Sequence, residues 1–127
     1  IEGEHTMKTK YQVIADERLP FDLAERGMVA LLVLSHRGKV RLASHPYFPL
    51  LSPDIQKKIR ILAAILRVAD GLDYPHRGSV TGFTCSVNPD TVICTVSGTG
   101  DLSTEREQAC HKADLFRQVF YHDLVIL

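Results

Sequence analysis

This chain of 127 residues lacks an excess of charge of either sign. Lysine and arginine together number 15, as do aspartate and glutamate, so the formal net charge is zero. A zero net charge excludes the overall basic field that attracts nucleic acid, so any binding of a polyanion must be local. We therefore expect no nucleic-acid partner.

The sequence also lacks an uninterrupted apolar segment of membrane-spanning length, a secretory signal, and internal repeats. We find no glycine-rich phosphate loop, no serine nucleophile elbow and no paired-cysteine zinc motif, which argues against three common chemistries. We expect no membrane partner and a cytoplasmic location. The first residue is Ile1 rather than methionine, which favours an excised or partial domain.

Cysteine is scarce, with only Cys85, Cys94 and Cys110. The count is odd and the spacing is not that of a metal motif. Cys85 and Cys94 fall in segments that we expect to be strands. Buried free thiols of a reducing cytoplasm are the simpler interpretation, and one disulfide is the alternative.

Hydrophobic residues make up 45% of the chain and charged residues 24%, which predicts a globular protein with a sizeable core. The fold class that we expect is α+β, with a helical part at residues 1–77 and a small β-β-α-β part at 78–127. Caps, turn residues and β-branched runs predict helices over Thr6–Asp16, Leu23–His36, about Pro53–Leu72 and Ser103–Phe120, and strands over Ser79–Val87, Thr91–Ser97 and Leu124–Leu127. Tyr47 and Phe48, in the linker between two of these helices, are expected to pack on the core.

One predicted helix carries acids where its pattern calls for apolar residues. Helical spacing from Ile59 through Ala63 and Leu66 leads to Asp70 and then Asp73. An ionised carboxylate that faces a core costs several kcal/mol unless it gains a cation, a metal or strong donors. Asp70 therefore indicates either a functional site or a cap network, and Asp73 is interpreted as a turn residue.

His36 ends another apolar stripe, four residues after Leu32. If His36 and Asp70 converge, imidazole and carboxylate together suit zinc, manganese or iron, although a metal site normally needs three or more protein ligands. The alternative is that His36 pairs with Asp70, or caps carbonyl groups, with no metal.

The helix that carries Asp70 also has basic residues, and no acid lies between Asp54 and Asp70 to neutralise them. If they share a surface with the basic residues after His36, they form a local phosphate-binding groove, because guanidinium groups match phosphate oxygens. The alternative is an ordinary solvated face. The residues concerned are Lys57, Lys58, Arg60 and Arg67 on the helix and Arg37, Lys39 and Arg41 after His36.

Two segments carry a resemblance to a known family. LSHR at residues 34–37 and LAAILRVADGLD at 62–73 resemble the C-terminal HD-type domain of the exopolyphosphatase and guanosine pentaphosphate phosphohydrolase (Ppx/GppA) family. Residues 13–20 and 101–116 extend the similarity over nearly the whole chain. The resemblance implies an HD-like helical unit followed by a small α/β appendage.

The resemblance also implies roles for individual residues. Asp70 matches the last aspartate ligand of HD phosphohydrolases, and His36 matches the histidine of the family's histidine-arginine motif. An active HD site also needs a histidine-aspartate pair and an earlier histidine. The only His-Asp dipeptide here is His122-Asp123, in the wrong subdomain, and His5 is the only substitute near the start. A divalent metal (Zn, Mn, Fe or Mg) would therefore meet a degenerate site of His5, His36 and Asp70.

Three hypotheses follow. The first is an accessory domain that binds polyphosphate or a guanosine polyphosphate through Arg37, Lys57, Arg60 and Arg67 and helps to form a homodimer, with actin-like phosphatase domains elsewhere in the full enzyme. The second is a metal-dependent HD phosphohydrolase, in which a metal-bound hydroxide attacks phosphate. The third is a non-catalytic structural or dimerisation module.

Overall fold

The structure is a computed structural model that describes residues 12–38 and 42–127. It has the α+β class expected from the sequence, with helices and a three-stranded sheet. The chain divides into two compact units, one ending at Ala63 and the other beginning at Ala64, and each is described by itself. This division falls inside helix α3 (Pro53–Leu72), earlier than the domain boundary expected after residue 77, which stays a prediction.

In the first unit, two helices begin directly after a residue whose side chain caps them. Helix α2 (Leu23–Ser35) begins after Asp22, whose side chain accepts a hydrogen bond of 2.8 Å from the backbone N–H of Glu25. Helix α3 begins after Ser52, whose hydroxyl accepts a hydrogen bond of 3.3 Å from the backbone N–H of Ile55. Both helices were predicted within a residue, whereas the predicted helix Thr6–Asp16 lies largely outside the described residues.

Two short 3-10 helices precede α3, η1 (Leu42–Ser44) and η2 (Phe48–Leu50). The side-chain amide of Gln56, on α3, donates to the backbone carbonyls of Phe48 and Leu51, both at 3.0 Å. Phe48 is buried, as predicted, but Tyr47 is 61% exposed. Only one of the two aromatic residues of this linker therefore packs on a core.

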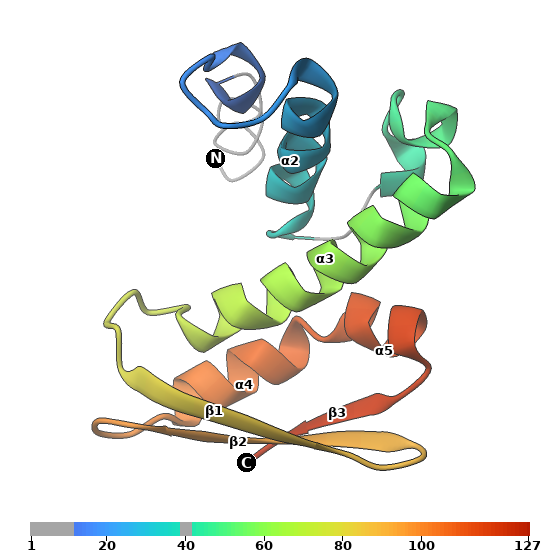
Figure 1. The fold of residues 1–127 in the computed structure, drawn as a ribbon. Helices are drawn as coiled ribbons and strands as arrows, with labels where there is room; N and C mark the ends of the chain where they lie inside the picture. Colours follow the sequence, from blue (N-terminus) through green and yellow to red (C-terminus); the bar gives the residue numbers. More distant parts are fainter. Residues whose placement is uncertain (1–11, 39–41) are drawn as a thin grey trace. The chain divides into compact units, whose positions relative to one another are not determined.

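The second unit is built on the sheet. Strands β1 (Val80–Val87), β2 (Thr91–Gly98) and β3 (Asp123–Ile126) lie in this order, with β1 and β2 antiparallel and β2 and β3 parallel. Helices α4 (Ser103–His111) and α5 (Asp114–Phe120) connect β2 to β3 and lie along one face of the sheet, with the second half of α3 beyond them (Figure 1). Their core consists of Val68, Cys94, Ala109, Ala113 and Leu124.

The single helix predicted over Ser103–Phe120 is wrong, because the structure has two helices there. Lys112 and Ala113 separate them, with ψ angles of 10° and 12° in place of helical values. No glycine or proline marks this break in the sequence. The side chains on either side of Ala113 instead form ion pairs with α3, and the turn lets both reach it.

Gly71 allows α3 and α4 to approach closely. A Cβ atom added at Gly71 would lie 2.6 Å from the Cα atom of Ala109 and 2.7 Å from its backbone nitrogen. Ala109 is itself fully buried. No larger residue fits at position 71 unless the backbones of the two helices move apart.

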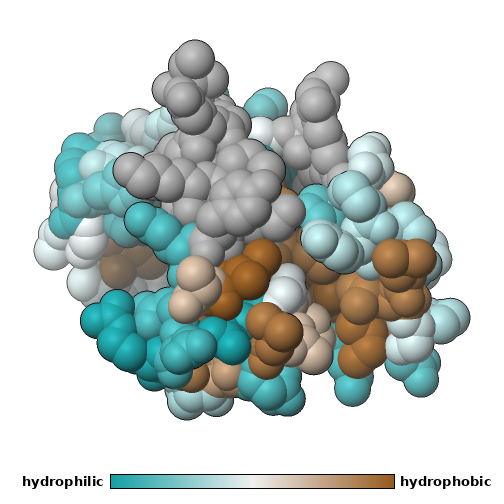
Figure 2. Space-filling view, turned by 90° about the horizontal axis from the view of Figure 1, so that it is seen from above, coloured by the Kyte–Doolittle hydropathy of each residue, from teal (hydrophilic) through white to brown (hydrophobic). Residues whose placement is uncertain are grey.

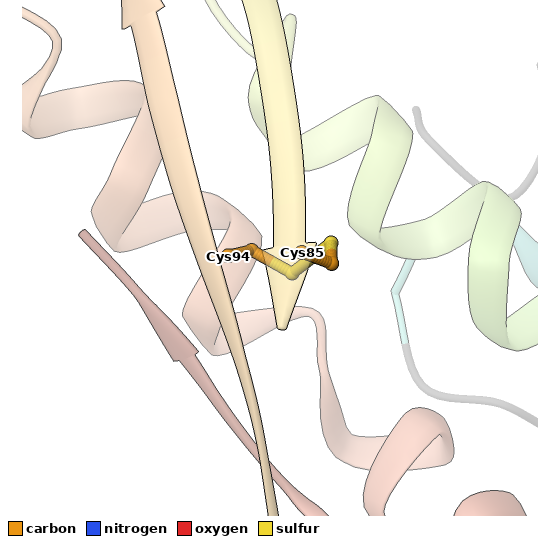
Figure 3. The surroundings of a disulfide bond; sticks show 2 residues. All are labelled: Cys85 and Cys94. Carbon is orange, nitrogen blue, oxygen red and sulfur yellow. A yellow bond between two sulfur atoms is a disulfide. The ribbon is translucent and has the colours of Figure 1, made fainter. Parts of the chain in front are cut away.

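The expectation of free thiols at Cys85 and Cys94 is wrong, since these residues form a disulfide between β1 and β2 (Figure 3). They are directly opposite each other in the register, with Cα atoms 4.2 Å apart. Cys94 is buried in the core, whereas Cys85 is exposed. Cys110 is free, as predicted, but exposed.

In the described part of the chain, no helix combines the length and the apolar character needed to cross a bilayer. Several large apolar side chains are nevertheless exposed, including Leu23, Tyr47 and Leu50 of the first unit. The space-filling view shows hydrophobic areas next to hydrophilic ones on the face turned to the viewer (Figure 2). Hydropathy therefore does not single out one site on that face.

Candidate functional site

The inward-facing acid of α3 has a cation as its partner. The ammonium group of Lys112, just after α4, donates a hydrogen bond to the Oδ2 atom of Asp70. The Lys112 side chain is 9% exposed and that of Asp70 20% exposed, so the pair lies largely out of water. The carboxylate thus has the compensating charge that its position requires.

A second ion pair lies one turn earlier on α3. The guanidinium of Arg67 donates from Nε to Oδ1 of Asp114 at 3.0 Å and from Nη2 to Oδ2 at 3.1 Å. The Arg67 side chain is only 4% exposed. Arg67 therefore does not lie on an exposed basic side of the helix, and the prediction that it binds phosphate is not supported by its position.

Together these two pairs join α3 to the junction between α4 and α5. Lys112 and Asp114 flank Ala113, which is fully buried; Lys112 pairs with the acid on α3, Asp70, and Asp114 pairs with the base, Arg67. Two complementary pairs fix the register of α3 on the junction, because a shift by one turn would place like charges together. The two pairs therefore have a structural role, which is to hold α3 against the junction of α4 and α5.

A third pair of the second unit leaves one buried atom without a partner. Arg77 donates from Nη2 to Oε1 of Glu105 at 2.8 Å, and this hydrogen bond lowers the pKa of the Glu105 carboxyl below its ordinary value. The Glu105 side chain is 1% exposed. Its Oε2 atom is buried and has no hydrogen-bond partner in the described part of the chain.

His36 caps the end of α2. Its φ and ψ angles of −75° and −19° are near-helical, and its Nδ1 atom contacts the carbonyl oxygen of Val33. His36 belongs to the first unit and Asp70 to the second, and each has a polar partner inside its own unit. His36 therefore caps a carbonyl group, which is one of the alternatives that needs no metal. Asp70 is balanced by a cation rather than by a metal.

The predicted metal site thus gains no support from these contacts. Over residues 12–38 and 42–127, no group of three or more His, Cys, Asp or Glu side chains is placed to hold a metal ion. His5 lies outside the described residues. The Oδ2 atom of Asp70 already accepts a hydrogen bond from the ammonium group of Lys112.

The remaining basic residues of the predicted phosphate site lie in the first unit. Lys57 and Lys58 are exposed on the first half of α3, and Arg60 and Arg37 are half-buried. None of the four forms an ion pair with a described residue. Lys39 and Arg41 lie outside the described residues. Uncompensated cations of this kind can bind the oxygens of a phosphate.

Neither a comparison with models of known protein families nor one with curated proteins finds a match for this chain. The resemblance to the exopolyphosphatase and guanosine pentaphosphate phosphohydrolase family stays a prediction from the sequence.

Proposed function

We propose that this chain is the C-terminal accessory domain of an exopolyphosphatase or guanosine pentaphosphate phosphohydrolase, with an HD-like helical part. In this role it binds polyphosphate or a guanosine polyphosphate through Lys57, Arg60 and Arg37, with Lys58 beside them, and it helps the enzyme to dimerise in the cytoplasm. Catalysis belongs to actin-like phosphatase domains outside this segment.

The distribution of charge along α3 carries the proposal. In the second half of the helix, Arg67 and Asp70 are neutralised by Asp114 and Lys112. In the first half, Lys57 and Lys58 are exposed and have no acidic partner among the described residues. One half of the helix therefore contributes stability, and the other half offers the unpaired positive charge that a polyanion requires.

The test is the binding of a fluorescently labelled inorganic polyphosphate, measured by anisotropy at several salt concentrations. We expect Lys57→Gln and Arg60→Gln each to weaken binding about three- to tenfold and to reduce the dependence on salt. Arg18→Gln is the matched control, since Arg18 is 91% exposed and paired with Asp16 in the same unit. If Lys57→Gln and Arg60→Gln bind as the parent does, the polyanion site is refuted.

A non-catalytic structural module is the second candidate function, and the two ion pairs on the second half of α3 favour it. It predicts no binding of polyphosphate above that of a neutral polymer. The metal-dependent phosphohydrolase predicts instead a stoichiometric divalent metal that is lost in Asp70→Asn. Measuring the metal content of the purified parent and of this variant therefore tests the remaining alternative.

A further inference from the structure

Strand β1 is an edge strand with unusual composition. The sheet order places β1 beside β2 only, and six of its eight residues are exposed. Its sequence, VTGFTCSV, contains no charged residue and no proline. Edge strands of stable monomers usually carry such residues, because the free backbone groups of an edge otherwise pair with another chain.

The register shows which backbone groups point outward. At the turn, Asn88 donates to the carbonyl of Thr91 at 2.8 Å, so these two residues form a hydrogen-bonded pair. Pairs alternate along antiparallel strands, and the Cα distance of 4.2 Å between Cys85 and Cys94 is that of a non-hydrogen-bonded pair. The backbone N–H and C=O groups of Phe83, Cys85 and Val87 therefore point away from β2.

The side chains of the same three residues share the face of the sheet on which Cys94 lies. Phe83 is 43% exposed and Val87 is 73% exposed. These two apolar residues are placed symmetrically, two positions before and two positions after Cys85. A strand with this arrangement is complementary to its own antiparallel copy.

We infer that β1 pairs with β1 of a second copy of this chain, in an antiparallel arrangement with a two-fold axis at Cys85. The outward N–H and C=O groups of both copies then form the hydrogen-bonded pairs, and Phe83 of each copy packs against Val87 of the other. The disulfide to Cys94 holds the register of β1 while it pairs.

This inference rests on the dimerisation part of the proposed function, and sedimentation equilibrium of the full chain tests it. We expect a reversible dimer for the parent and a dissociation constant at least tenfold higher for Val87→Lys. Thr95→Lys is the matched control, because it adds the same charge to an exposed position of the central strand β2, away from the pairing edge, and it should keep the dimer. A parent that is monomeric at all concentrations refutes the pairing.

A cross-linking experiment keeps the test independent of how the lysine variant folds. Two-fold pairing about Cys85 places Thr84 of one copy directly opposite Ser86 of the other, at a non-hydrogen-bonded position where a disulfide can form. With Cys110→Ser as background, a mixture of Thr84→Cys and Ser86→Cys chains should give a mixed disulfide after mild oxidation, and Thr84→Cys alone should not. A dimer without this mixed cross-link overturns the pairing.

Polyphosphate binding by the Val87→Lys chain is measured in parallel. The basic residues of the proposed polyphosphate site lie outside β1, so a parent chain that binds polyphosphate but does not dimerise rejects this inference alone. If the parent chain does not bind polyphosphate, the polyanion site is rejected instead.

Discussion

The ammonium group of Lys112 donates a hydrogen bond to the carboxylate of Asp70, and the two residues lie 42 positions apart in the sequence. The resemblance proposed from the sequence predicts a metal ligand at Asp70. Here the positive charge beside it comes from a lysine of the chain itself. The ion pair gives Asp70 a structural role that needs no metal.

We predict that Lys112→Met lowers the free energy of unfolding by about 2 to 3 kcal/mol, because it leaves the Asp70 carboxylate largely buried without a cation. Urea unfolding at neutral pH measures this loss. The double variant Asp70→Leu with Lys112→Met should recover most of it, since it replaces both charges by apolar groups. A Lys112→Met chain that is as stable as the parent and binds a divalent metal would favour the metal site instead.

Gly71 should be intolerant of even one methyl group. We predict that Gly71→Ala destabilises the protein by about 1 to 3 kcal/mol, because the new Cβ atom would overlap the backbone at Ala109 and force α3 and α4 apart. This loss would outweigh the gain of about 1 kcal/mol that alanine brings to a helix. Thermal or urea unfolding provides the measurement.

Gly27 is the matched control, as a glycine inside α2 with no atom within 4 Å of an added Cβ. Gly27→Ala should therefore stabilise the protein by about 0.5 to 1 kcal/mol. Equal effects of the two substitutions would contradict the close approach of α3 to α4.

Local signals predict most of the fold. Asp22 and Ser52 cap the helices that follow them, and the turn before Thr91 separates the two β-branched strands. The break between α4 and α5 has no such local signal. It depends on contacts of Lys112 and Asp114 with residues that lie 42 and 47 positions earlier, which periodicity cannot reveal.

Two features of the sequence predict the burial of Arg67 and the pairing of Cys85 with Cys94. Arg67 lies four residues after Ala63 and eight after Ile59, both fully buried, so it belongs to the buried face of α3 despite its spacing from Arg60. Cys85 and Cys94 each lie three residues from the pair that closes the turn, Asn88 and Thr91, which places the two thiols opposite each other. The partner of Asp70 had no comparable signal.

Acid should weaken the protein through Glu105. The hydrogen bond from Arg77 lowers the Glu105 pKa from its ordinary value of 4.5. The unfolded chain therefore takes up this proton at a higher pH than the folded one. The stabilisation is complete above about pH 4.5 and is lost as the pH falls below that value through the folded pKa.

We predict that Arg77→Gln lowers the midpoint temperature at neutral pH by about 5 °C or more, because it leaves the Glu105 carboxylate buried without a cation. The variant should also lose less stability than the parent between pH 5 and pH 3. Arg117→Gln is the control, since it removes an exposed pair with Asp123 that contributes little. Identical acid profiles for the Arg77 variant and the parent would contradict the role of this pair.

The disulfide can be tested by counting the reactive thiols of the chain. We predict that the unfolded, unreduced chain has one reactive thiol, that of Cys110, and that a dithiol reductant raises the number to three. Reduction should lower the free energy of unfolding by about 2 to 3 kcal/mol, the value expected when a disulfide closes a short loop. Cys85→Ser should cause a similar loss and make stability insensitive to reductant, because Cys94 then has no partner. Three thiols in the unreduced chain would contradict the disulfide and show that Cys85 and Cys94 are free.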